Sequence, residues 1–165
     1  MKTSDKGINL IIEFESLHDG DLTKIGLQPK LDPIGIWTEG YGRAMRNDNG
    51  TFLKGASNKE LAYKRATIKT EKDARSALLE DLESRERIVI QNIRVPLNQN
   101  QFDALVSYVY NTGGSSTLYR YINMGQKPEV IRNWFETKYI TAGGVKLKGL
   151  VRRRKAEADL YFSKL

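Results

Sequence analysis

The stretch DPIGIWTEGYG, residues 32–42, carries the main information about the fold. It lies within residues 18–55, where glycine and proline interrupt short apolar runs, a composition typical of turns and short strands. Asp32 and Pro33 predict a turn that leads into a strand carrying Thr38. The glycines are Gly20, Gly26, Gly35, Gly40, Gly42, Gly50 and Gly55. We therefore expect a small, irregular β-lobe over residues 18–55.

The segment before this lobe predicts a helix over residues 4–17, capped by Thr3 or Ser4. Helical spacing places four residues on one stripe: Ile8, Ile11, Ile12 and Glu15. A carboxylate held against apolar groups has a raised pKa, which suits a general acid. The alternative is a solvated or Arg-paired carboxylate at a frayed helix end. From this feature alone, the structural alternative is favoured.

The segment after the lobe, residues 56–165, has helical patterns to its end. Capping boxes are expected at residues 70–73 and 98–101, a break at Gly113–Gly114, and Pro128 in a first helical turn. A basic last helix is expected over residues 150–163. The fold class is therefore α+β and mostly helical: one domain, with a small N-terminal β-lobe and a larger C-terminal helical lobe.

Composition excludes several kinds of chemistry. The 165 residues contain no cysteine, so thiol catalysis and thiolate metal sites are excluded, and the one histidine, His18, makes a Ser-His-Asp triad a poor candidate. No apolar run is long enough for a membrane span, and the charged N-terminus does not resemble a secretory signal. The net charge of +7 favours polyanionic partners without choosing among them. Neither a cofactor nor a metal is expected.

Hydrolysis of a glycosidic bond needs a second group besides Glu15. The acids that follow are Asp19, Asp21, Asp32 and Glu39. Taken alone, Asp32 is more often a turn-forming residue than a catalytic one. Local chemistry therefore supplies candidates without choosing a function.

Three blocks in order resemble the phage-type lysozymes, or endolysins, the muramidases of glycoside hydrolase family 24. The first is FESL at residues 14–17, which resembles the family's Phe-Glu-Gly-Leu. The second is DPIGIWTEGYG, which resembles Asp-x-x-Gly-x-x-Thr-Ile-Gly-Tyr-Gly. The third comprises PLNQNQFDALVS at 96–107, NTGG at 111–114 and GLVRRR at 149–154.

The resemblance implies a lysozyme-like fold and hydrolysis of the β-1,4 bond between N-acetylmuramic acid and N-acetylglucosamine in bacterial peptidoglycan, with inversion. Glu15 would be the general acid, Asp32 would orient or deprotonate the attacking water, and Thr38 would hold that water. Arg152 matches a family position that approaches the catalytic glutamate.

Two further residues are candidates for substrate binding. Tyr41 could stack on a sugar ring, although aromatic residues beside strands, including Trp37, are more often part of the core. Asn111 could bind an acetamido group or serve as a helix C-cap. For most of the basic cluster Lys146–Lys155 we expect a solvated helix face, with Arg152 as the exception.

The chain departs from the family pattern at three places. Residues 18–30 resemble an insertion, so Asp19 or Asp21 could replace Asp32, although the spacing from Asp32 to Thr38 favours Asp32. Glu39 replaces an isoleucine and suggests a more exposed or wetter site. Arg43 replaces a common histidine, and a salt bridge from Arg43 could take over its role.

Other functions remain open: a basic nucleic-acid-binding module, an inactive wall-binding domain of the same fold, and a lytic transglycosylase. The preferred interpretation is a monomeric endolysin that binds peptidoglycan and neither nucleic acid nor membrane. It would be made in the bacterial cytoplasm and reach the wall after a holin permeabilises the membrane.

Overall fold

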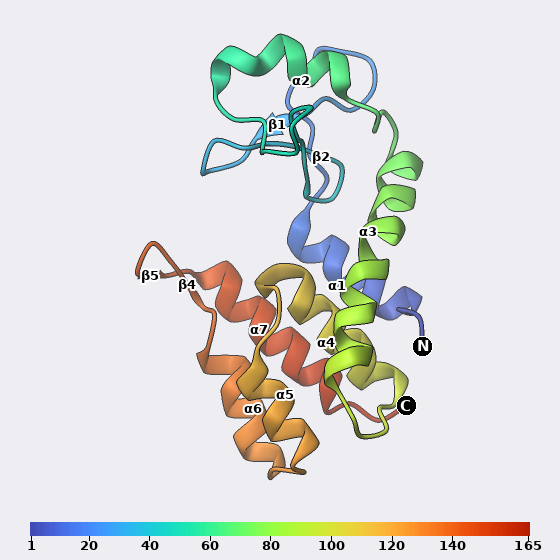
Figure 1. Cartoon of the computed structure of the whole chain (residues 1–165), viewed down its shortest axis with the longest axis vertical. Coiled ribbons are helices and arrows are strands. Elements are labelled where there is room, and N and C mark those ends of the chain that lie inside the picture. The colour runs from blue at the N-terminus through green and yellow to red at the C-terminus, as the bar shows by residue number, and fades with distance from the viewer. The chain divides into compact units, whose positions relative to one another are not determined.

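The computed structural model describes all residues, 1–165, and confirms a mostly helical α+β chain (Figure 1). In chain order its elements are α1 (Asp5–Glu15), β1 (Lys30–Leu31), β2 (Trp37–Glu39), β3 (Arg43–Ala44), a 3-10 turn η1 (Ala56–Asn58), α2 (Lys59–Arg65), α3 (Glu71–Asn92), α4 (Gln99–Thr112), α5 (Ser116–Asn123), α6 (Pro128–Thr137), β4 (Thr141–Ala142), β5 (Val145–Lys146) and α7 (Lys148–Tyr161).

The chain forms two compact units. The β-unit comprises Glu15–Asp81, and the helical unit comprises Met1–Phe14 together with Leu82–Leu165. The boundary therefore lies inside α3, later than the expected start of the helical lobe at residue 56. The reason is packing: Ala62 of α2 is buried in one apolar cluster with Trp37, Met45 and Leu53.

The β-unit contains an antiparallel sheet of order β1-β2-β3, as the turn-rich composition predicts. Lys30 pairs with Thr38 across β1 and β2, and Glu39 pairs with Arg43 across β2 and β3. The turn before β2 is closed by a hydrogen bond from the Gly35 N–H to the Asp32 carbonyl, and Gly35 has a φ of 81°. A left-handed backbone suits glycine there because it has no Cβ to clash.

Helix α1 ends at Glu15, two residues earlier than expected. Ser16 has a φ of 59°, a left-handed conformation that cannot continue the helix. The predicted apolar stripe is buried at Ile8 and Ile11, which are 5% and 0% exposed. Glu15 is therefore the last helical residue and lies where the chain changes direction.

Helix α4 is the most deeply buried element of the helical unit, and α7 packs against it. The predicted capping box is present: Asn98 accepts from the Gln101 N–H, and Gln101 accepts from the Asn98 N–H. Both termini of the chain are tied to the start of α4, since Gln99 donates to the Lys2 carbonyl and Asn100 to the Lys164 carbonyl.

Other predicted boundaries hold closely. Asp73 and Thr70 exchange hydrogen bonds at the start of α3, with Asp in the place of the usual Glu. Gly113 ends α4 in a left-handed conformation, and Pro128 occupies the first turn of α6. Gly143 and Gly144 form the turn of the short β4–β5 hairpin, with φ values of 57° and 79°.

Candidate active site

A pocket of about 500 Å³ lies within the β-unit at the end of α1. Its lining contains both carboxylates that the family resemblance makes catalytic, Glu15 and Asp32. The complete lining is Glu15, Ser16, Leu17, His18, Asp19, Leu22, Lys30, Leu31, Asp32 and Pro33. Segments separated by the 18–30 loop therefore meet around one solvent-accessible volume.

The backbone beyond α1 is fixed by Gly40, which follows β2. The Gly40 carbonyl accepts hydrogen bonds from the His18 N–H and from its ring Nδ1, each 2.9 Å long. A carbonyl only accepts, so Nδ1 carries the proton and Nε2 of a neutral ring is an acceptor. This double contact holds His18 at the pocket rim, three residues after Glu15.

Asp32 is held rigidly by its own turn. Its Oδ1 accepts from the N–H groups of Ile34 and Ile36, at 3.0 and 2.8 Å. These are the contacts of a turn-forming aspartate, as the structural alternative expects. Because both bonds use Oδ1, the second oxygen, Oδ2, lies outside them, so turn formation and a role in the pocket are compatible.

Thr38 does not line this pocket. It is 5% exposed in β2, and its hydroxyl donates to the Ile36 carbonyl at 3.3 Å. Glu15 and Asp32 thus share this pocket, and Thr38 lies behind it in β2, where it pairs with the lining residue Lys30. The water-holding role of Thr38 stays a prediction.

Of the alternatives to Asp32, one shares the pocket. Asp19 is part of the lining, and its Oδ1 accepts from the N–H groups of Asp21 and Gln28. Asp21 is outside the lining and binds Thr23, and the hydrogen bonds from the Thr23 hydroxyl and N–H lower the pKa of its carboxyl. Asp19 is therefore the stronger rival.

None of the three predicted substrate-binding residues lines the pocket. Tyr41 is 5% exposed, and its hydroxyl donates to Glu71 at 3.3 Å. Asn111 is exposed in the last turn of α4 and accepts from Arg154 at 2.7 Å, while Gly113 is the C-cap. Arg152 is exposed on α7. Their binding roles stay predictions, and Tyr41 has the surroundings of a core residue.

Two expectations about the departures from the family pattern meet different outcomes. The expected exposure at Glu39 is wrong: Glu39 is 6% exposed and accepts from the Thr67 hydroxyl and from the N–H groups of Thr67 and Ile68. The salt bridge expected of Arg43 is present, because its Nε and Nη2 both bind Asp81 at 3.0 Å.

A family model described as phage lysozyme matches residues 22–157, which include Asp32 and Thr38 but not Glu15. The chain belongs to the phage lysozyme family. An endolysin of Acyrthosiphon pisum secondary endosymbiont phage 1 is 29% identical over 169 residues, 99% of each chain. This phage lysozyme spans only 55% of the endolysin of Bacillus phage B103, to which it is 29% identical over 99% of its own length.

Solved structures agree with the family assignment. An endolysin from Escherichia coli O157:H7 phage FAHEc1 has a TM-score of 0.71 and 32% identity, covering 98% of this chain and 94% of that one. The muramidase domain of SpmX from Asticaccaulis excentricus has a TM-score of 0.73 and 28% identity, covering 99% of both chains. The expected lysozyme fold is confirmed, and so is the expected function, a glycoside hydrolase that degrades peptidoglycan.

No helix of this lysozyme combines the length and the apolar composition needed to cross a bilayer.

Sequence reasoning missed several residues of this phage lysozyme. His18 and Lys30 both line the pocket, and neither was among the candidate site residues. Arg153 and Arg154 are 3% and 0% exposed, so the solvated face expected of the basic cluster is wrong for these two. Helical spacing could have found Arg154, because it precedes the buried Ala158 and Tyr161 by four and seven residues.

Proposed function

We propose that this lysozyme hydrolyses the β-1,4 bond between N-acetylmuramic acid and N-acetylglucosamine, with Glu15 as the general acid. Asp32 orients or deprotonates the attacking water, and Thr38 assists in holding it. The observation that supports this most is the shared pocket of Glu15 and Asp32. Two carboxylates with a water between them are the requirement for an inverting glycosidase.

The two carboxylates have different surroundings, as their roles require. Glu15 is half-buried and ends a helix whose previous turns are buried at Ile8 and Ile11. Asp32 accepts hydrogen bonds from two backbone N–H groups of its own turn. The proposal therefore gives the acid role to the carboxylate that ends an apolar helix and the water-orienting role to the carboxylate fixed in a polar turn.

The first experiment measures clearing of purified peptidoglycan and the products of wild type and Glu15→Gln. We expect new reducing ends from the wild type and a loss of at least about 100-fold in Glu15→Gln, since general acids contribute 10²–10⁴-fold. Anhydro sugars in place of reducing ends would indicate a transglycosylase. If the folded wild type released neither product from several types of cell wall, the interpretation as an inactive wall-binding domain would replace the proposed function.

The second experiment separates Asp32 from Asp19. Asp32→Asn is expected to lower the rate by about 10²-fold or more, whereas the matched Asp19→Asn retains most of it. NMR of the freshly formed anomer reports inversion or retention. A loss confined to Asp19→Asn would transfer the role to Asp19.

We also propose that the protein acts as a monomer and reaches the wall through a membrane permeabilised by a holin. Sedimentation velocity at micromolar concentration tests the first part. Expression in a bacterial host with and without a permeabilising agent tests the second, with lysis expected only after permeabilisation.

A further inference from the structure

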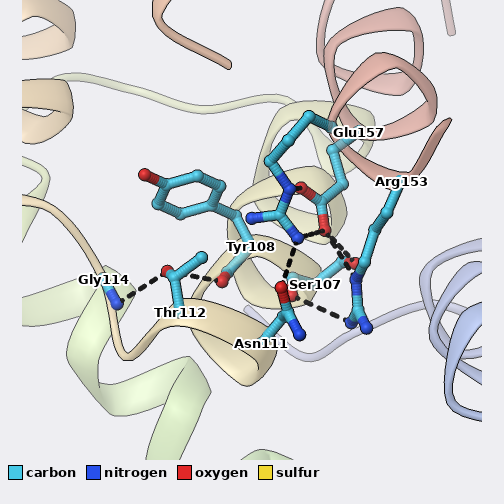
Figure 2. Close-up of polar contacts among 8 residues, drawn as sticks. Ser107, Tyr108, Asn111, Thr112, Gly114, Arg153 and Glu157 are labelled. Carbon is cyan, nitrogen blue, oxygen red and sulfur yellow. Dashed lines mark hydrogen bonds and ion pairs between the residues drawn. The ribbon is translucent and has the colours of Figure 1, made fainter. Parts of the chain in front are cut away.

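The helical unit contains a fully buried carboxylate, Glu157 of α7, which is 0% exposed. Its Oε1 accepts from the Ser107 hydroxyl at 2.7 Å and from Arg153 Nε at 3.2 Å. Its Oε2 lies 3.2 Å from Arg154 Nε. Figure 2 shows Glu157 between residues of its own helix and Ser107 of α4. One carboxylate therefore holds two arginine side chains.

The buried ionic cluster of Glu157, Arg153 and Arg154 adds little to the stability of the fold by itself. Burial raises the pKa of the Glu157 carboxyl, even though Arg154, Arg153 and the Ser107 hydroxyl favour its charged form. Desolvation of buried ions often cancels their attraction, so apolar residues of similar volume would fill the space at least as well. What the ionic cluster supplies, and apolar residues would not, is a fixed direction for each guanidinium.

The two guanidinium groups are held in different directions. Arg154 donates to Asn111 at 2.7 Å, and its guanidinium carbon lies 5.0 Å from the centre of the Tyr108 ring. Arg153 donates to the Ser107 carbonyl, and its guanidinium carbon lies 5.9 Å from the centre of the Phe14 ring. Phe14 directly precedes Glu15 in α1.

We propose that Glu157 is a positioning residue for hydrolysis, which acts through Arg153 by holding its guanidinium against Phe14, next to the catalytic Glu15. This inference rests on the proposed function of Glu15. The buried position of Arg153 means that its charge is weakly screened by solvent at the end of α1. A guanidinium fixed there orients the last turn of α1 and the acid it carries.

The experiment compares Glu157→Gln with Glu86→Gln, using soluble, uncrosslinked glycan strands as substrate. Glu86 is a matched control: it is 6% exposed in the same unit and accepts from the N–H and hydroxyl of Thr3. Glu157→Gln is expected to lower kcat about 10-fold with KM nearly unchanged, because misplaced catalytic groups lose rate rather than binding. Glu86→Gln retains the wild-type kcat.

A double-mutant cycle shows whether Glu157 acts through Arg153. In an Arg153→Met background, Glu157→Gln is expected to cause no further loss of kcat, whereas independent effects would multiply. Ser107→Ala removes one bond to Glu157 and is expected to give a smaller loss of the same kind. It supplies the test if Glu157→Gln does not fold.

The outcomes separate the two proposals. A wild type that releases no reducing ends overturns the proposed function. An active wild type with unchanged kcat in both Glu157→Gln and Ser107→Ala overturns only the positioning role. Melting temperatures accompany the kinetics, with a fall of roughly 10 °C expected for Glu157→Gln, and assays at 10 °C keep every variant folded.

Discussion

At the scale of single residues, the surroundings of a charged side chain decide its role. Glu39 and Asp32 lie seven residues apart, yet Glu39 is buried against Thr67 and Ile68 while Asp32 lines a pocket. Glu39 is a structural carboxylate that ties the end of β2 to the segment before α3. Asp32 retains an oxygen outside its turn and is available for chemistry.

Glu39→Gln is expected to destabilise the protein by about 2 kcal/mol. The amide loses the charge that strengthens three hydrogen bonds, and its NH₂ group can face the N–H donors of Thr67 and Ile68. Urea unfolding measures the difference. The exposed Glu60→Gln of α2 is the control and should change stability by less than about 0.5 kcal/mol. Equal stability changes in Glu39→Gln and Glu60→Gln would show that the charge of Glu39 does not contribute to stability.

At the scale of elements, capping residues set where helices begin and end. Asn98 with Gln101 begins α4, Thr70 with Asp73 begins α3, and Gly113 ends α4. These bonds join residues three apart, so local composition is enough to predict them. The end of α4 carries Asn111, which binds Arg154 of α7, so the helix boundary also places part of the buried arginine cluster.

Gly113→Ala and Gly114→Ala form a matched pair at this boundary. Both glycines have positive φ, 81° and 107°, but a Cβ at Gly113 meets nothing within 4 Å, whereas one at Gly114 lies 2.2 Å from the Tyr119 hydroxyl oxygen. Gly113→Ala is expected to cost about 1–2 kcal/mol of stability, from backbone strain alone. Gly114→Ala should cost about 1–3 kcal/mol more. Denaturant unfolding tests this, and equal losses would exclude the steric contribution of Tyr119.

At the scale of the whole molecule, contacts between distant parts of the chain join its ends to its interior. Glu86 of α3 accepts from Thr3 at 2.8 Å, and Lys2 lies 3.0 Å away. Burial raises the pKa of the Glu86 carboxyl, but the Thr3 N–H, Lys2 and the Thr3 hydroxyl outweigh it and hold the pKa below its ordinary value. The charged form of Glu86 therefore stabilises the native state.

The lowered pKa of Glu86 predicts that the stability of the protein depends on pH. A lowered native pKa contributes stability above the unfolded pKa of about 4.3, and the contribution is lost as the pH falls through the native value. Wild type should exceed Glu86→Gln by about 1 kcal/mol at pH 7, and the difference should vanish in acid. Urea unfolding between pH 7 and pH 3 measures it, with the more exposed Glu83→Gln as control. A difference independent of pH would contradict the proton linkage.

The sequence by itself determined the α+β class, most helix boundaries and the family, because each depends on residues close together in the chain. It also supplied Glu15 and Asp32 as candidates. Only the tertiary structure decided that they share a pocket with His18 and Asp19, that Glu39 is buried, and that Arg153 rather than Arg152 contacts Phe14. Burial depends on partners far away in the chain, such as Thr67 for Glu39 and Ser107 for Glu157, and spacing along the chain does not reveal them.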